Sequence, residues 1–184
     1  GHIRAVAAEI GAVLRDKPDA VPVRRALARA HLQAGDGGLA EETLRQAVQA
    51  NPRDLLARLD LAQLLLHQGK PEAALPVIEQ LVKDEPNNVA ALEALYRVQA
   101  GARDLEAALA TANAIQALQP KLPLGYYLAG LVQQGQRRSG DAAKSFATAV
   151  SLAPADWQSW RGQALAELSQ GNVEGAISVF RQGI

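Results

Sequence analysis

The chain has 184 residues and carries 19 basic and 19 acidic side chains, so its formal net charge at pH 7 is zero. General nucleic-acid-binding proteins normally carry an excess of basic residues that neutralises phosphates, and this composition argues against that class. The chain has no cysteine, which excludes disulfides, thiolate metal ligands and a cysteine nucleophile. It also has no methionine, and we therefore expect it to be a piece of a longer protein. No run of about 18 apolar residues occurs, so no membrane span is predicted.

The first predicted element is a single helix over residues 3–15. Its apolar residues recur at helical spacing and form one stripe, which consists of Ile3, Val6, Ala7, Ile10, Val13 and Leu14. The helix lies just before Pro18, and later hairpins also have a proline just after their second helix. We therefore interpret residues 3–18 as the second helix of a truncated hairpin.

Residues 21–54 predict a complete helix hairpin. Its first helix runs to about residue 34, with Asp19 as its N-cap. The sequence Gly35-Asp36-Gly37-Gly38 then breaks the helix, and a second helix extends to about Ala50. Three glycines in four residues predict that this turn is the loosest of its kind in the chain.

Residues 55–88 predict the same hairpin again. Asp54 is the predicted N-cap of the first helix, and the turn follows Gly69. Pro71 suits the first turn of the second helix. Pro76 lies further inside that helix and is predicted to kink it or to remove one hydrogen bond from it.

Three more segments follow the same pattern, over residues 89–122, 123–156 and 157–184. Asn88 is the predicted N-cap of the first of them, and the last begins after Asp156. Their turns are predicted at Gly101 and Asp104, at Gly135 and Gly140, and at Gly171-Asn172. The sequence therefore predicts an all-α protein of about eleven helices with no strand.

Two residue types recur at a fixed interval of 34 residues along the chain. The prolines are Pro18, Pro52, Pro86, Pro120 and Pro154, and the alanines are Ala40, Ala74, Ala108, Ala142 and Ala176. This pattern resembles the tetratricopeptide repeat, whose period is 34 residues. The resemblance implies that antiparallel helix hairpins stack into a right-handed superhelical α-solenoid, with the first helix of each hairpin on the concave side. The alanine series is the family's small-residue site, where a larger side chain would hold the two helices apart.

Some positions depart from the family pattern. The family prefers an aromatic or large apolar residue at the fourth position of each repeat, where this chain has Arg24 and Arg58. It prefers a small residue at the eighth position, where this chain has Tyr96. The asparagine that clamps acidic tails of chaperones in some members is also missing, because the corresponding residues include Asp60 and Gly162.

The resemblance also implies which side chains face the concave groove and could bind a partner. These residues are Arg25, Arg29, Gln33, Asp60, Gln63, His67, Glu93, Arg97, Tyr127, Leu131, Gln134 and Arg161. Tyr127 and Leu131 would form an apolar anchor, and arginines would lie at one end of the groove. The alternative is that these side chains are solvated surface residues with local ion pairs. Glu93 and Arg97 are four residues apart and could pair with each other.

No pattern of catalytic, metal-binding or cofactor-binding residues stands out. His31 and His67 lack a partner at metal-ligand spacing on their own helices, and no glycine-rich phosphate loop is present. We expect Trp157 and Trp160 to pack at the junction of the last two repeats; the alternative is that Trp157 is exposed for a partner. The sequence therefore predicts no cofactor, no metal and no enzymatic activity within this chain.

The leading functional hypothesis is a scaffold that holds a peptide or a helix of a partner protein in its concave groove. One alternative is a periplasmic scaffold for exopolysaccharide synthesis or export, because the Ala-, Leu- and Gln-rich repeats resemble bacterial envelope proteins of that kind. Another is the substrate-recruiting arm of an enzyme whose catalytic domain lies outside this chain. The exopolysaccharide alternative places the protein in the bacterial periplasm or envelope, and a cytoplasmic location stays open. Exposed apolar ends of the array also predict self-association.

Overall fold

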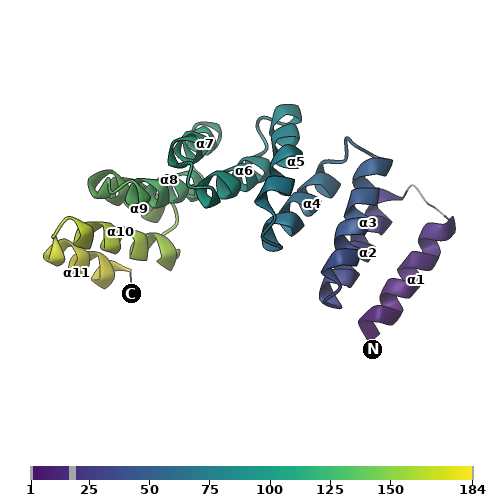
Figure 1. The fold of residues 1–184 in the computed structure, drawn as a ribbon. Helices are drawn as coiled ribbons and strands as arrows, with labels where there is room; N and C mark the ends of the chain where they lie inside the picture. Colours follow the sequence, from purple (N-terminus) through teal and green to yellow (C-terminus); the bar gives the residue numbers. More distant parts are fainter. Residues whose placement is uncertain (1, 17–19, 184) are drawn as a thin grey trace. The chain divides into compact units, whose positions relative to one another are not determined.

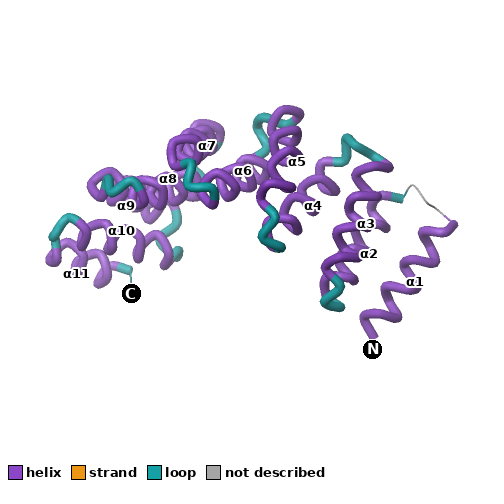
Figure 2. The backbone as a smooth tube through the Cα atoms, in the orientation of Figure 1, coloured by secondary structure: helices purple, strands orange, loops and turns teal. Residues whose placement is uncertain are grey.

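The computed structural model describes residues 2–16 and 20–183. These residues form eleven α-helices joined by short loops, and no strand occurs among them (Figures 1 and 2). The helices are α1 (His2–Asp16), α2 (Val21–Gln33), α3 (Gly37–Ala50), α4 (Leu55–His67), α5 (Pro71–Asp84), α6 (Val89–Gly101), α7 (Leu105–Leu118), α8 (Pro123–Gly135), α9 (Ser139–Leu152), α10 (Trp157–Ser169) and α11 (Val173–Gln182). The predicted all-α fold is confirmed. The predicted cap Asp19 and the first proline of the series, Pro18, lie outside the described residues.

The chain divides into two compact units. The first spans residues 1–86 and contains α1 to α5, and the second spans residues 87–184 and contains α6 to α11. Within each unit every helix packs against the next one along the chain. None of the described helices has the length and apolar character needed to cross a lipid bilayer.

Each hairpin is closed by a three-residue turn whose middle residue has a left-handed backbone. These residues are Gly35 (φ +82°), Gly69 (φ +70°), Arg103 (φ +60°), Arg137 (φ +61°) and Gly171 (φ +78°). The prediction of an unusually loose first turn is wrong, because Gly37 and Gly38 are the first residues of α3. Gly101, Gly135 and Gly140 also belong to helices rather than to turns. Two arginines therefore occupy backbone positions that favour glycine.

Side-chain caps begin several helices. The carboxylate of Asp54 accepts a hydrogen bond from the Ala57 amide at 2.7 Å, and the Asn88 side chain accepts one from the Ala91 amide at 3.1 Å. Asp156 caps α10 in the same way through the Ser159 amide. The predicted caps Asp54 and Asn88 are confirmed. Asp104 and Asn172 also cap the second helices of their hairpins.

The five alanines of the 34-residue series lie in the tightest part of each hairpin. All five are at most 2% exposed: Ala40, Ala74, Ala108, Ala142 and Ala176. A methyl group lets two helix axes approach closely, and a longer side chain would have to push them apart. This burial accounts for the recurrence of alanine at the second-helix position.

A second close contact lies in the second unit, around the ring of Phe146. This ring on α9 is fully buried, and it lies against Gly130 of α8 and Gly162 of α10. A Cβ atom added at Gly130 would lie 2.8 Å from the ring, and one added at Gly162 would lie 2.6 Å from it. The two helical glycines therefore provide the space that the largest fully buried side chain occupies.

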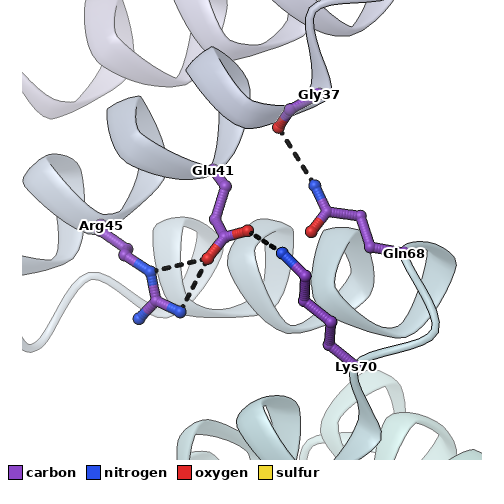
Figure 3. Close-up of polar contacts among 5 residues, drawn as sticks. All are labelled: Gly37, Glu41, Arg45, Gln68 and Lys70. Carbon is purple, nitrogen blue, oxygen red and sulfur yellow. Dashed lines mark hydrogen bonds and ion pairs between the residues drawn. The ribbon is translucent and has the colours of Figure 1, made fainter.

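Polar contacts join the turn between α4 and α5 to α3 of the preceding hairpin (Figure 3). The Gln68 amide donates to the backbone oxygen of Gly37 at 3.1 Å. Beside it, the Glu41 carboxylate pairs with Lys70 at 2.7 Å and with Arg45 at 2.9 Å. Hydrogen bonds from Lys70 and Arg45 lower the pKa of Glu41 from its usual value.

Glutamines at the same repeat position make equivalent contacts in the second unit. Gln136 donates to the Glu106 carboxylate at 2.8 Å, and Gln170 donates to the Ser139 backbone oxygen at 3.4 Å. Like Gln68, each follows the last residue of the first helix of its hairpin and contacts the first turn of the preceding second helix. A glutamine recurring at the repeat interval is therefore a sequence signal for contacts between neighbouring hairpins.

Two departures from the family pattern are accommodated by polar partners. The Arg58 side chain is buried, and its guanidinium donates to Asp84, the last residue of α5, at 2.5 Å. This contact, together with one from Gln80, lowers the pKa of Asp84. In the second unit, the Tyr96 hydroxyl donates to the Leu128 backbone oxygen at 3.2 Å, and burial raises the pKa of Tyr96 to about 12. Pro76 lies inside α5, which continues through it as one helix.

The glycine contacts with Phe146 predict the effect of Gly162→Ala on stability. In a helix interior this change normally stabilises by roughly 1 kcal/mol. Here we expect the free energy of unfolding to fall by roughly 1–3 kcal/mol, because the new methyl group overpacks the ring. Urea denaturation monitored by circular dichroism measures the change.

The control is Gly101→Ala in the same unit, where an added Cβ would contact nothing within 4 Å. We expect this variant to be as stable as the wild type or slightly more stable. Combining Gly162→Ala with Phe146→Leu should recover part of the lost stability. A Gly162→Ala variant more stable than the wild type would contradict this account of the glycines.

The left-handed turn residues predict a stabilising change. Arg103→Gly should raise the free energy of unfolding by about 1 kcal/mol, because glycine adopts this backbone without a clash of its Cβ. The reverse change at the equivalent turn, Gly69→Arg, should lower it by about the same amount. If both variants had the same denaturation midpoint as the wild type, the turn conformation would not limit stability.

Candidate functional site

The candidate site is a groove in the first unit, with a cavity of about 480 Å³ between α2, α3 and α4. Its lining consists of Arg25, Ala28, Arg29, Leu32, Leu44, Asp60, Gln63, Leu64 and His67. Five of these residues were predicted to face a partner: Arg25, Arg29, Asp60, Gln63 and His67. The groove thus brings together polar side chains from the first helices of two consecutive hairpins, which are separated in the sequence by α3.

Helical spacing explains why these side chains share one space. Arg25 and Arg29 are one turn apart on α2, so they lie on the same face of that helix. Asp60, Gln63 and His67 recur at intervals of three and four residues and share a face of α4 in the same way. Because α2 and α4 contact each other directly, the two faces border the same groove.

The floor of the groove is apolar and closed. Ala28, Leu44 and Leu64 are all buried, and they come from α2, α3 and α4 respectively. Leu32 lies at the rim and remains 44% exposed. A leucine exposed beside a buried apolar floor is a surface that a partner side chain could cover.

The charged groups of the groove converge on one oxygen atom. Oδ2 of Asp60 lies 2.6 Å from Nε of Arg25 and 4.0 Å from the Arg29 guanidinium. The Arg25 side chain is only 15% exposed, whereas that of Arg29 is 67% exposed. Two guanidinium groups therefore share one carboxylate, and the charged side chains of the lining leave one positive charge uncompensated.

Gln63 and His67 form the remaining polar part of the lining. The Nδ1 atom of His67 lies 2.9 Å from the backbone oxygen of Gln63. A carbonyl oxygen only accepts hydrogen bonds, so Nδ1 is the nitrogen that carries the proton in this contact. In the neutral ring Nε2 is then an acceptor.

The other predicted partner-binding residues do not join this groove. Gln33 is the last residue of α2 and is exposed outside the lining. Glu93 and Arg97 lie on α6, and within the described part of that helix no ion pair joins them. Gln134 is half-buried near the end of α8.

Tyr127 lies against the core of the second unit rather than standing free. Its ring is 5.8 Å from that of Phe146, centroid to centroid, at an angle of 60°. Half-buried Tyr127 packs against the cluster around Phe146, while Leu131 on the same helix is exposed. Of the predicted apolar anchor, only Leu131 presents a largely free side chain.

The prediction that Trp157 packs inside the repeat junction is wrong. Trp157 is 58% exposed, and the guanidinium carbon of Arg161 lies over its ring at 4.7 Å from the centroid. Trp157 is the first residue of α10, where its side chain can point into solvent. Trp160 packs within the last hairpin, against Ala164 of its own helix and Ala176 and Val179 of α11.

A second hollow in the first unit is larger than the groove, but fewer of its lining residues are buried. It measures about 640 Å³ and is bordered by α1, α2 and α3. Among its lining residues only Ala7 is buried, and its one ion pair joins the exposed Arg4 to Asp36 at 3.4 Å. The groove at α2 and α4 is the better-built site because it combines a buried floor with a partly buried ion pair.

The apolar residues of the groove were not predicted as part of a site. In the sequence, Ala28, Leu32 and Leu64 look like ordinary residues of an apolar helix face. Leu44 belongs to the second helix of its hairpin, where no partner-binding residue was predicted. The available signal was their position beside the predicted polar residues: Leu32 follows Arg29, and Leu64 follows Gln63, by one turn or less.

Comparison with known proteins identifies the repeats. One family model described as tetratricopeptide repeat matches residues 32–97, and another with the same description matches residues 1–54 and 127–184. The ranges of the second model alone cover more than half of the chain. No curated protein sequence matches this chain.

Several solved structures share the fold. A crystal structure of MamA is 18% identical, covers 89% of this chain and 89% of its own, and has a TM-score of 0.77. MamA from Desulfovibrio magneticus RS-1 is 20% identical, covers 89% and 92% of the two chains, and has a TM-score of 0.78. YrrB, described as a TPR protein with an unusual peptide-binding site, is 17% identical, covers 88% and 84%, and has a TM-score of 0.74. The helix hairpins, their 34-residue recurrence and the family matches together establish that this chain belongs to the tetratricopeptide repeat family and has its α-solenoid fold.

Proposed function

We propose that this chain is a non-catalytic scaffold that binds a peptide or a helix of a partner protein in the groove between α2 and α4. The observation that carries the proposal is the groove itself, in which a buried apolar floor lies beside a partly buried ion pair. Protein binding sites typically combine apolar walls with a few polar groups that fix orientation. The cavity of about 480 Å³ is large enough to accept side chains of a bound segment.

The helical construction of the groove favours recognition through side chains. The backbone donors and acceptors of α2 and α4 are used within the helices, so a partner meets no free strand edge there. Such a surface suits an amphipathic helix, or an extended segment that inserts alternate side chains. YrrB, a TPR protein with an unusual peptide-binding site, is consistent with this use of the fold.

The composition of the lining favours binding over chemistry. It contains no serine, threonine, lysine or tyrosine that could act as a nucleophile, and its carboxylate is already paired with arginine. His67 is the other general-base type in the lining, and the recorded contact of its Nδ1 atom is a backbone carbonyl. In the part of the chain that the structure describes, no three His, Asp or Glu side chains are grouped as a metal site.

The remaining predicted contacts are proposed as a separate surface of the second unit. There Leu131, Leu165 and Trp157 expose apolar area, and Arg161 covers part of the Trp157 ring. Glu93, Arg97 and Gln134 would contribute polar contacts to that surface. The roles in exopolysaccharide export and in enzyme recruitment stay predictions from the sequence.

Substitution of Leu32 tests the proposal. Random peptides displayed on phage are selected on the wild-type chain, and the most enriched peptide is synthesised with a fluorescent label. We expect Leu32→Ser to weaken its binding about tenfold, because a leucine that is covered on binding contributes roughly 1.5 kcal/mol or more. Fluorescence anisotropy measures Kd, and circular dichroism confirms that helicity is retained.

Leu56→Ser is the matched control. Leu56 is 51% exposed on α4 but lies outside the groove lining, so its loss should leave Kd unchanged. Wild-type affinity in the Leu32→Ser variant would exclude this groove as the binding site.

A further inference from the structure

The charges of the groove are unbalanced in a way that specifies a ligand. Arg25 and Arg29 both face Oδ2 of Asp60, at 2.6 Å and 4.0 Å. At 4.0 Å the Arg29 guanidinium is beyond hydrogen-bond distance, so it keeps its donors for another acceptor. Asp60 is the only acidic residue in the lining. One additional negative charge would therefore neutralise the charged side chains of the groove.

The position of this charge beside apolar walls strengthens its effect. Leu32 and Leu64 belong to the same lining as Arg29, and Ala28 and Leu44 close the floor. A bound segment would exclude water from these walls, and a charge pair gains strength where water is excluded. A guanidinium presents several N–H groups in a plane, which matches the two oxygens of a carboxylate.

We propose that the groove selects an internal segment of a partner protein in which an Asp or Glu side chain lies close to an aliphatic side chain. The carboxylate binds the Arg29 guanidinium beside the Arg25–Asp60 pair, and the aliphatic side chain packs against Leu32 and Leu64. This inference rests on the proposed function, because it names the chemistry of the segment that the same groove binds.

The charge count favours a carboxylate over a phosphate group. A carboxylate carries a single negative charge and leaves the lining neutral. A phosphorylated side chain carries about two charges at neutral pH and would leave an excess negative charge beside Asp60. A side-chain carboxylate is also favoured over a free chain end, because the asparagine with which some members of the family clamp acidic tails is absent from this chain.

The test begins with the phage selection on the whole 184-residue chain. The displayed peptides are fused to the coat protein through their C-termini, so they present no free terminal carboxylate. We expect the enriched sequences to share an Asp or Glu close to Leu, Ile, Val or Phe. The most enriched one is then synthesised with an amidated C-terminus in two forms, one with the acidic residue and one with Gln or Asn in its place.

Binding of both peptides is measured on the wild type, Arg29→Gln and Arg53→Gln. Neutralising either the peptide carboxylate or Arg29 should raise Kd about tenfold, as expected for a charge-assisted hydrogen bond. Combining both changes should cost little more than either alone, because both remove the same contact. Arg53→Gln removes one positive charge from the same unit outside the lining and should leave Kd unchanged.

Three other outcomes would overturn the inference. Enriched peptides that lack an acidic residue, yet lose affinity in Leu32→Ser, would refute the acidic preference and leave the proposed function standing. Equal affinity of the acidic peptide and its Gln or Asn form for the wild type would refute the side-chain carboxylate as the group that the Arg29 guanidinium binds. Binding that is insensitive to both Leu32→Ser and Arg29→Gln would refute the inference and the proposed function together.

Discussion

Close packing of two helices over an alanine is the contact on which the rest of this structure depends. Each hairpin has a fully or almost fully buried alanine at the same position of its second helix, at intervals of 34 residues. In a densely packed interior, added methylene groups at such a contact cost about 1–3 kcal/mol, because neighbouring atoms have no free volume to move into. In the first unit this packing brings α3 against α2, so that Leu44 of α3 can form the floor of a groove whose sides come from α2 and α4.

The groove shows how a common repeat geometry can present a surface that is particular to one chain. The repeat places Arg25 and Arg29 on one helix and Asp60, Gln63 and His67 on the equivalent helix of the next hairpin. What is particular to this chain is the identity of the side chains there, above all two arginines that face one aspartate. The second unit has different chemistry on the equivalent helices, with Leu131, Leu165 and an arginine lying over an exposed tryptophan.

Much of the fold could be predicted from the sequence, because periodic patterns report on periodic structure. The helix hairpins, the capping residues Asp54 and Asn88 and the alanine series all follow from local spacing. The turns could not be read as reliably, since glycine was taken as the marker of each break. Arg103 and Arg137 hold the left-handed position in two turns, while nearby Gly101 and Gly135 end helices. The turn geometry is imposed by the packing of the two helices, which overrides the local preference of arginine.

The candidate site was only partly predictable for a related reason. The resemblance to the repeat family implied which residues share the inner face of each first helix, and Arg25, Arg29, Asp60, Gln63 and His67 line one groove. It does not indicate which face is closed by a third element, so the role of Leu44 was missed. It also does not reveal side-chain contacts such as that of Tyr127 with Phe146, whose ring lies against Gly130 and Gly162.

The most direct test of the account is a crystal structure of the chain bound to its selected peptide. We expect the peptide to lie across α2 and α4, with a carboxylate at Arg29 and an aliphatic side chain against Leu32 and Leu64. A peptide found instead in the hollow between α1 and α3, or over Trp157 and Arg161 on α10, would contradict the assignment of the groove as the binding site.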